Sequence, residues 1–528
     1  MGTFVSGYAL LAAGTAMNDA SRRLRSGGLS AAVVTLLAGN LVVTLCNLFR
    51  DVAVAASLGA SRSADYFYLA ISIPVLVVTV AGGAYRSVVV PLLVRKAAGA
   101  NGSFHAAVAR LTWLNVVGVV GVAGLCASVL GLGYLVADRM GVHVGIASLL
   151  SVMLLVIPMY ALAGFIEMSQ GVLQASGSLM MPNLSRAALP AGILIGAGLG
   201  GPAAGISGLI FGGTAGALTG ASLVAWQLSR LGVPMRRVRA QLPAPEARQF
   251  LHNFRALLIA SSVLLLTPVI GQWLAGLQGP GSVSALGYAF RLTVGATALI
   301  TGSLAPVLLE FFAREDDGYP TSLPGRAFFE IATAFAWAGC CMTLGFWIAS
   351  AYLIEFIYQR GAFTGADARH VTLLANCYAM QFPILFAGVA ATSLISARAL
   401  NRVFVPINVV LLIGNVLLTI LLMHLLGDAG IALASSLTYV LSLTLLVLTL
   451  IRYKVVSADR VNLQRLLAPF AVLAGAASVV FLGSLRLTRD ADLLQYAGAG
   501  FLLVAFAVLT IAFNRGFIRR ALASWHGS

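Results

Sequence analysis

The chain has 528 residues, of which 59% are hydrophobic and 9% are charged. Soluble globular proteins carry about 25% charged residues, so this composition excludes an ordinary soluble domain and indicates a membrane protein. Lys and Arg outnumber Asp and Glu by 33 to 17, which gives a formal net charge of +16. Because the basic residues cluster in alternate loops between apolar runs, the charge indicates membrane orientation rather than nucleic-acid binding.

Apolar runs long enough to cross a bilayer, about 20 residues each, recur along most of the chain. We therefore predict an all-α polytopic membrane protein with about fourteen transmembrane helices. The predicted spans are 29–50, 66–94, 107–137, 145–175, 179–199, 203–229, 249–275, 285–313, 327–357, 368–398, 404–424, 429–451, 464–485 and 493–513. They leave no room for a soluble catalytic domain.

Residues 1–28 are predicted to be a cytoplasmic extension, because their apolar start precedes the arginines, whereas a signal peptide has its positive charge first. Basic residues then mark every second loop. The clusters are Arg22, Arg23 and Arg25; Arg95 and Lys96; Arg230, Arg236, Arg237 and Arg239; Arg398 and Arg402; Arg452, Lys454 and Arg460; and Arg515, Arg519 and Arg520. Loop 275–285 has no Lys or Arg. This positive-inside pattern predicts that both termini are cytoplasmic and that the number of spans is even.

The chain repeats itself at an offset close to 225 residues. The matches are Pro158 with Pro383 (383 − 158 = 225), Pro182 with Pro406 (406 − 182 = 224), Gly205 with Gly430 (430 − 205 = 225), and Ser63-Ala64 with Ser284-Ala285 (284 − 63 = 221). We predict two pseudo-symmetric six-helix lobes, 29–229 and 249–453, joined by a cytoplasmic linker, 230–248. Two additional helices in 464–513 and a cytoplasmic tail, 514–528, would follow.

Paired repeats of this kind are typical of transporters, whose lobes rock about a substrate site. No HExxH, GxSxG or Walker A motif occurs, so we expect a transporter without a cofactor rather than an enzyme. Transport would be driven by the membrane potential, an ion gradient or the gradient of the substrate. The five cysteines lie in apolar runs without metal-ligand spacing, and we interpret them as packing residues.

Charge is concentrated in one apolar region, residues 47–91, which contains Arg50, Asp51, Asp65 and Arg86. A charge in hydrocarbon costs about 2.5–3.5 kcal/mol, so such residues usually face a bundle interior or a watery cavity. Asp65 begins the second span, where it either pairs with Arg50 or Arg62 or caps a helix. Solvated positions are expected for the charges near span ends, which are Arg86, Glu310 and Glu355.

Arg50 ends the first span and Arg291 lies just inside the eighth, in the other lobe. Two guanidinium forks across a cleft could hold a pyrophosphate. The competing interpretation pairs Arg50 with Asp51 and lets Arg291 snorkel outward. Glu167, in the middle of the fourth span, is a candidate proton or cation site or an acid buried neutral, with Arg186 as a candidate partner.

Four stretches resemble motifs of the MurJ/MviN family, the lipid II flippases of the MOP exporter superfamily. They are FRDVAVAASLGASRSADYFYLAISIP at 49–74, LGYAFRL at 286–292, IYQRGAFTGAD at 357–367 and SARALNRVFVP at 396–406. The resemblance extends from about residue 29 to the C terminus. It implies fourteen helices in two lobes around a cationic cavity, and movement of a polyprenyl-pyrophosphate-linked sugar to the outer leaflet by alternating access.

The resemblance implies substrate-binding roles for Arg50, Asp51, Asp65 and Arg291, which match charged positions of the family. Position 44, where the family has a further cavity arginine, is Thr44 here. At the other departures, Val78 and Thr79 stand in place of the arginine pair of helix 2 of the family, and Gly82 stands in place of its acid. Val294 stands in place of the acid of helix 8. The scaffold is thus retained with about half of the cavity charge pattern of the family.

We therefore expect a bacterial inner-membrane flippase for an undecaprenyl-pyrophosphate-linked saccharide, lipid II or a related peptidoglycan precursor. By the resemblance, a groove in the last two helices would accommodate the lipid tail. Cell-wall or polysaccharide synthesis machinery is an expected partner. Three alternatives remain open: an exporter of another lipid-linked glycan such as an exopolysaccharide unit, a drug or cation antiporter coupled through Glu167, and a membrane scaffold that does not transport.

Overall fold

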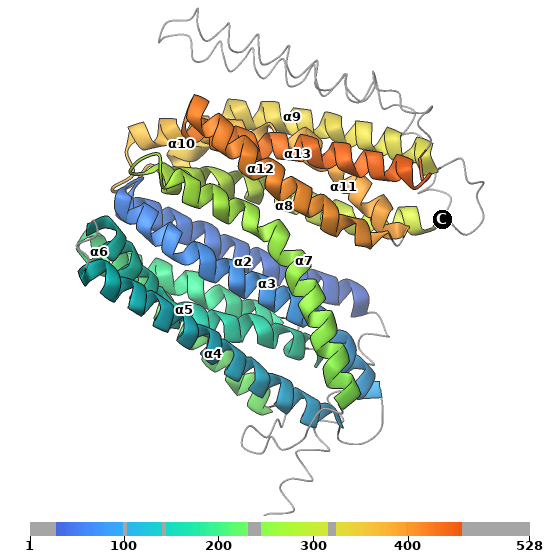
Figure 1. Ribbon diagram of the computed structural model, residues 1–528, viewed down its shortest axis with the longest axis horizontal. Coiled ribbons are helices and arrows are strands. Elements are labelled where there is room, and N and C mark those ends of the chain that lie inside the picture. The colour runs from blue at the N-terminus through green and yellow to red at the C-terminus, as the bar shows by residue number, and fades with distance from the viewer. Residues whose placement is uncertain are drawn as a thin grey trace, which may run out of the picture. The chain divides into compact units, whose positions relative to one another are not determined.

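The computed structural model describes residues 28–98, 103–139, 144–176, 178, 180–230, 244–314, 324–398 and 400–456. Within these ranges the regular structure is helical and contains no strand, as Figure 1 shows. The all-α prediction is therefore confirmed. The predicted spans 464–485 and 493–513, the extension 1–28 and the linker 230–248 lie wholly or mostly outside the described residues.

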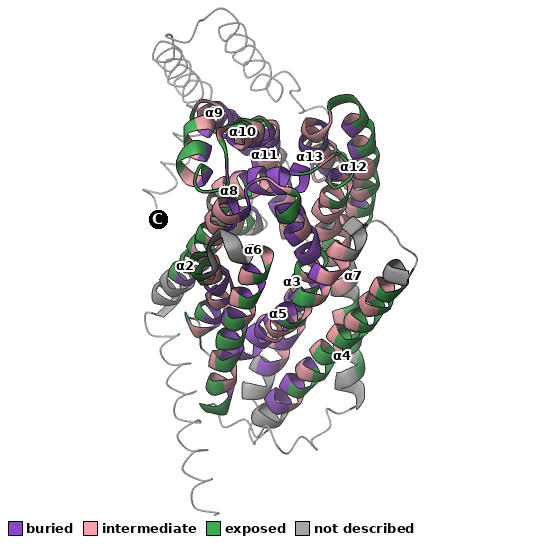
Figure 2. Cartoon of the chain, turned by 90° about the vertical axis from the view of Figure 1, so that its left-hand side faces the viewer, coloured by how far each residue is buried: buried purple, intermediate pink, exposed green. Residues whose placement is uncertain are grey.

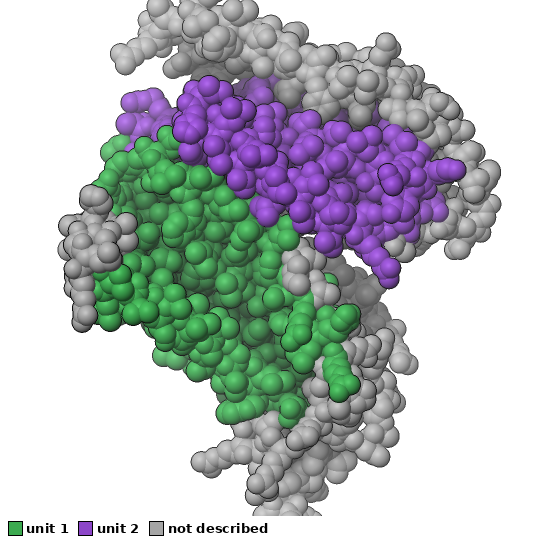
Figure 3. All heavy atoms as spheres, in the orientation of Figure 1, with its two compact units in different colours: residues 1–284, 360–364 green, residues 285–359, 365–528 purple. Residues whose placement is uncertain are grey.

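The chain divides into two compact units, coloured separately in Figure 3. Unit 1 comprises residues 1–284 and 360–364, and unit 2 comprises residues 285–359 and 365–528. Helix α7 packs on α3 and so belongs to unit 1. The boundary between the two six-helix lobes at residues 230–248, which rests on the sequence repeat alone, stays a prediction.

Unit 1 contains α2 (Gly28–Leu58), α3 (Arg62–Ala98), α4 (Ser103–Arg139), α5 (Val144–Ala175), α6 (Met180–Arg230) and α7 (Ala244–Ala275). Helix α3 packs along α5, and α2 packs along α6. Helix α4 is largely exposed (Figure 2), and its apolar side chains Trp113, Val120 and Leu125 are each more than half exposed. Such a surface is stable where hydrocarbon rather than water surrounds it.

Helix α6 turns back on itself at Gly205, which has a φ of +49°. A Cβ at Gly192 would collide with the backbone of Gly212 and Gly216, and one at Gly196 would collide with that of Gly208. The arms 180–199 and 205–230 therefore run antiparallel with their backbones in contact, which small residues permit in membrane helices. These arms correspond to the predicted spans 179–199 and 203–229.

Three connecting segments meet within unit 1 at the end of α2. The Ala362 backbone N–H donates to the Ala56 carbonyl over 2.8 Å. Gly59 and Gly361 both have left-handed φ values, +62° and +60°. A Cβ at Gly59 would lie 2.6 Å from the Ala362 carbonyl oxygen, and one at Gly281 would lie 2.6 Å from that of Ala60. Glycine is required here both for its φ and for the close approach of the chains.

The core of unit 1 lies where α3, α4, α5 and the second arm of α6 converge, around Val89, Leu111, Leu173 and Leu228. Phe250 and Phe254 of α7 cover it, and each makes an edge contact with Tyr85. The Tyr85 hydroxyl donates to the Leu111 carbonyl over 3.0 Å, which joins α3 to α4.

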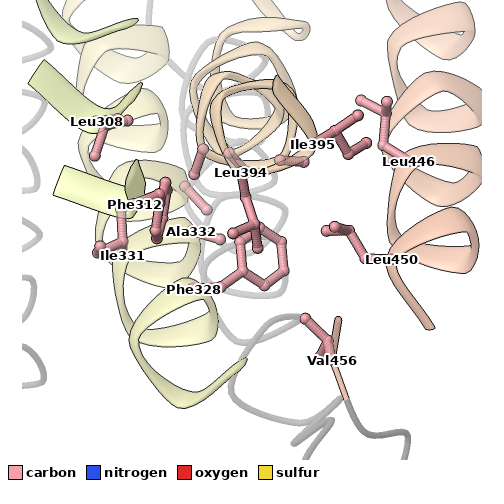
Figure 4. Close-up of a cluster of buried hydrophobic side chains, with 14 of the residues drawn as sticks. Leu308, Phe312, Phe328, Ile331, Ala332, Leu394, Ile395, Leu446, Leu450 and Val456 are labelled. Carbon is pink, nitrogen blue, oxygen red and sulfur yellow. The ribbon is translucent and has the colours of Figure 1, made fainter. Parts of the chain in front are cut away.

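Unit 2 contains most of α8 (Ser282–Arg314), with α9 (Pro324–Tyr358), α10 (Gly365–Ala379), α11 (Phe382–Ala397), the short 3₁₀ helix Asn401–Val403, α12 (Phe404–Leu426) and α13 (Asp428–Arg452). The predicted span 368–398 is interrupted between α10 and α11, just before Pro383. The core of unit 2 combines Phe312, Phe328, Leu394 and Leu450, as Figure 4 shows.

Nine helical segments of the described residues are long and apolar enough to cross a membrane. They correspond to nine of the twelve predicted spans that fall in the described ranges. The other three, 179–199, 249–275 and 285–313, are helical within α6, α7 and α8. The chain is thus a multi-pass membrane protein.

Candidate functional site

One face of α2 is polar although the helix is a candidate membrane span. Asn40, Thr44, Asn47 and Asp51 follow one another at spacings of four, three and four residues, which places them on one side of the helix. The other side carries exposed apolar residues such as Leu45 and Phe49. A helix with one polar and one apolar exposed side borders both water and hydrocarbon.

Thr44, at the position where the sequence comparison expects an arginine, is exposed and donates from its hydroxyl to the Asn40 carbonyl over 2.9 Å. The Asn47 amide donates likewise to the Val43 carbonyl over 2.9 Å. These bonds use one donor of each side chain, and each side chain also has an oxygen that can accept a hydrogen bond. This face can therefore hydrogen-bond to a polar ligand, but at Thr44 it carries no charge.

Arg50 and Asp51 form an ion pair near the end of α2. The Arg50 Nη2 lies 2.8 Å and its Nε 3.1 Å from Asp51 Oδ1. The side chains are 16% and 6% exposed. This confirms the local pairing of Arg50 with Asp51. The pairing uses two of the five N–H donors of the guanidinium, so further donors remain for a ligand.

Asp65 caps the start of α8, a helix far away in the sequence. Its Oδ2 accepts from the Gly281 N–H over 2.5 Å, and its Oδ1 accepts from the Ser284 N–H and hydroxyl, each over 2.8 Å. The carboxylate is buried. Of the two predicted roles, pairing or capping, these contacts are those of a cap. A substrate-binding role for Asp65 stays a prediction.

Arg291 lies on α8 in unit 2 and is half-buried. On the same helix, Tyr288 packs on Tyr358 with ring centroids 5.3 Å apart, and Phe290 packs on Tyr378 at 5.6 Å. These aromatic contacts fix the rotation of α8 about its axis and hence the direction of Arg291. Its predicted role in binding the substrate stays a prediction.

Glu167 on α5 lies between two arginines. The Arg186 Nε donates to Glu167 Oε1 over 2.5 Å, and the Arg86 Nη2 lies 3.7 Å from Glu167 Oε2. The predicted partnership with Arg186 is confirmed. The expectation of a solvated Arg86 holds only in part, because its side chain is 33% exposed but its guanidinium lies beside the Glu167 carboxylate. Glu355 is exposed as expected, and the side chain of Glu310 lies outside the described residues.

Sequence reasoning missed Arg86 because its environment is built by two glycines on two helices. Gly82 and Arg86 are one turn apart on α3, and Glu167 and Gly171 are one turn apart on α5. A Cβ at Gly82 would lie 2.9 Å from Glu167 Cβ, and one at Gly171 would lie 3.2 Å from Arg86 Cα. Each glycine thus makes room for the charged residue opposite. The available signal was this pair of reciprocal four-residue spacings, Gly-x-x-x-Arg and Glu-x-x-x-Gly.

A cavity of about 670 Å³ lies within unit 1 between α3, α4, α5 and α7. Residues such as Ile73, Val119, Ile157 and Phe254 line it, and none of its lining residues is an Asp, Glu, Lys or Arg. Such a lining suits a hydrocarbon chain rather than an ion. Among the described residues no cluster of His, Cys, Asp and Glu could hold a metal ion. The polar face of α2 and the charged groups above are therefore better suited to a polar substrate than this cavity is.

Comparison with known proteins identifies the family and the fold. The sequence profile of the family described as lipid II flippase MurJ matches residues 54–492. A curated protein of Bdellovibrio bacteriovorus, named "Probable lipid II flippase MurJ", is 25% identical over 347 residues. That match spans 64% of this chain and 64% of the relative, slightly less than two thirds of its length.

Among solved structures, a lipid II flippase MurJ in an inward closed conformation matches with a TM-score of 0.70 at 18% identity. The match covers 92% of this chain and all of that one. An inward-facing multidrug resistance MATE transporter of the MOP superfamily matches with a TM-score of 0.61 at 11% identity, covering 82% of this chain and 99% of that one. At these identities both likenesses concern the fold.

Proposed function

This chain belongs to the lipid II flippase MurJ family, and on that premise we propose that it moves lipid II from the inner to the outer leaflet of the bacterial inner membrane. The observation that carries the proposal is the family match over residues 54–492. The polar face of α2 supports it, because a membrane span needs such a face only where it borders a polar substrate or water. Transport would proceed by alternating access.

Arg50 and Arg291 are the residues proposed to bind the diphosphate of the substrate. Arginine stays charged and presents a planar fork of donors that suits phosphate oxygens. Asp51 would orient Arg50 through their 2.8 Å contact. Thr44 would offer its hydroxyl oxygen to the ligand at the position where the family has an arginine. Asp65 would act indirectly, by capping the start of α8, the helix that carries Arg291.

The energy source and surroundings complete the proposal. We infer that no cofactor is needed and that the membrane potential or an ion gradient drives transport. An inside-negative potential would favour outward movement of an anion by about 2.3 kcal/mol per charge per 100 mV. Both termini are proposed to be cytoplasmic. Residues 464–513 are proposed to hold the lipid tail, and the enzymes that make or polymerise the glycan are proposed partners.

The alternative functions have less support. An antiporter would need an acid that is free to exchange a proton or cation, whereas Glu167 is engaged by two arginines. The similarity to MATE transporters concerns the fold. A different lipid-linked glycan would use the same diphosphate chemistry, but the family match names lipid II.

Complementation tests the proposal. The full-length chain is expressed in cells depleted of their own lipid II flippase, beside Arg50→Ala and Arg291→Ala, with membrane levels matched by immunoblot. We expect rescue by the unchanged chain and loss of rescue in both variants. Arg248→Ala serves as a control, because Arg248 is exposed at the start of α7. No rescue by a chain that is inserted and folded would refute the lipid II assignment.

A further inference from the structure

Three charged residues, Arg86, Glu167 and Arg186, form a cluster that the proposed transport mechanism does not use. They come from α3, α5 and α6 within unit 1. None of them lines the apolar cavity. The reciprocal glycines, Gly82 and Gly171, hold α3 and α5 close enough for the cluster to form. The cluster is thus built by the packing of the helices and is not an accident of long side chains.

The two guanidinium groups retain most of their hydrogen-bonding capacity. In the described part of the chain, Arg186 donates to Glu167 through its Nε alone, so its two terminal amino groups have no acceptor. Arg86 approaches Glu167 at 3.7 Å, which is an ion-pair distance but longer than a hydrogen bond. A guanidinium has five N–H donors in total, so nine of the ten here remain open.

The charge of the cluster is also incompletely balanced. Two arginines against one glutamate leave a net charge of 2 − 1 = +1. The Arg86, Arg186 and Glu167 side chains are 33%, 30% and 18% exposed, so a ligand can reach them. Partly buried cations that keep open donors suit a doubly or triply coordinating oxyanion, and arginine pairs bind phosphate in this way.

The depth of the cluster points to the inner leaflet. Glu167 lies eight residues before the end of α5 and Arg186 six residues after the start of α6, about 12 Å and 9 Å along a helix. Arg86 lies nine residues before Arg95, in a basic cluster assigned to the cytoplasmic side, or about 14 Å. Half of the hydrocarbon core measures about 15 Å. The cluster therefore lies in the cytoplasmic half of the membrane, and a lipid head group would have to be drawn about 9–14 Å below the helix ends to reach it.

We propose that Arg86 and Arg186 form a binding site for the phosphate oxyanion of an inner-leaflet lipid head group, in which the carboxylate of Glu167 occupies the place that the ligand takes. Binding would replace the contacts of Glu167 by contacts to phosphate oxygens. Two lipids carry this chemistry, a polyprenyl diphosphate and an anionic phospholipid such as phosphatidylglycerol. If the ligand is the polyprenyl diphosphate, the inference rests on the proposed function; if it is phosphatidylglycerol, the inference stands without it.

Lipid binding to the purified full-length chain in detergent, followed by native mass spectrometry, tests the inference. The probes are undecaprenyl diphosphate, phosphatidylglycerol and, as a control without phosphate, diacylglycerol. Arg86→Gln and Arg186→Gln are expected to weaken binding of a phosphate-bearing lipid by roughly ten- to a hundredfold each. Arg186→Lys should recover part of the loss, because it keeps the charge without the fork. Arg248→Gln should match the unchanged chain.

Glu167→Gln separates a ligand site from a structural clamp. Because it removes the competing carboxylate, we expect binding to tighten by roughly two- to fivefold. A clamp predicts the opposite, namely that all three substitutions weaken binding together and lower the melting temperature alike. That outcome, or unchanged affinity in folded Arg86→Gln and Arg186→Gln, overturns the inference.

The choice of probe separates this inference from the proposed function. Changes confined to undecaprenyl diphosphate would make the cluster a substrate contact. Changes shared with phosphatidylglycerol would make it a general site for anionic lipids, and both results support the inference. A chain that fails to rescue the depleted cells but binds phosphatidylglycerol through Arg86 and Arg186 would refute the proposed function and leave the oxyanion site intact.

Discussion

At the scale of single residues, Asp65 is a charge whose removal should damage the fold. It accepts hydrogen bonds from two backbone N–H groups and one hydroxyl at the start of α8. Asp65→Ala would leave the N–H groups of Gly281 and Ser284 without an acceptor in a buried place, at a cost of about 1–3 kcal/mol for each such group. We expect a lower melting temperature in size-exclusion assays after heating.

The matched variants sharpen that prediction. Asp65→Asn keeps one acceptor oxygen, so its melting temperature should lie between those of the unchanged chain and Asp65→Ala. Ser63→Ala, an exposed neighbour on α3, should have no effect. If Asp65→Ala melted like Ser63→Ala, the cap would contribute nothing to stability.

The charged residues also show how far the sequence could be interpreted. The pairs Arg50–Asp51 and Glu167–Arg186 were predictable, because their members lie one and 19 residues apart. The partners of Asp65 lie more than 200 residues away, and no local pattern identifies them. Arg86 was assigned to solvent, because its position near a span end does not show that Gly171 on another helix opens a place for it.

At the scale of elements, the hairpin within α6 depends on glycine. Gly212→Ala would place a Cβ against the backbone of Gly192 and Gly196, which cannot move aside as a flexible side chain could. Gly198→Ala, in the same helix, would meet nothing within 4 Å. Alanine favours a helix over glycine by roughly 1 kcal/mol, so the control should be neutral or slightly stabilising.

We therefore expect Gly212→Ala to lower both the membrane level of the protein and its melting temperature, and Gly198→Ala to lower neither. Immunoblots of membranes and heated size-exclusion runs would measure these two quantities. Equal behaviour of the two variants would mean that the arms of α6 do not need backbone contact.

Helix existence was predictable from hydropathy, but helix interruptions were not. Pro158 stays inside the continuous helix α5, whereas its counterpart in the repeat, Pro383, follows the break between α10 and α11. A proline removes one N–H and is compatible with either a bend or a new helix start. The buried Gln381, whose N–H donates to the Tyr378 carbonyl, marks the second outcome.

At the scale of the whole molecule, the duplication and the contacts divide the chain differently. The repeat places α7 at the start of the second lobe, whereas α7 packs on α3 through Tyr85 and through the 3.1 Å bond from Trp273 Nε1 to Ser72 Oγ. A duplicated sequence records ancestry, while packing depends on which apolar faces are left uncovered. The first can be found from the spacing of prolines and glycines, but the second requires the structure.

The orientation of the whole chain gives the last prediction. Because basic residues gather in 230–239 and 515–520 and are absent from 275–285, reporter fusions after Arg239 and after Ser528 should be cytoplasmic, and a fusion after Gln278 should be external. A green fluorescent protein, bright inside, and an alkaline phosphatase, active outside, would measure each position. If the fusion after Arg239 were internal but that after Ser528 external, the number of spans after residue 239 would be odd. The predicted set of spans after residue 239, which ends with two additional helices in 464–513, would then be wrong.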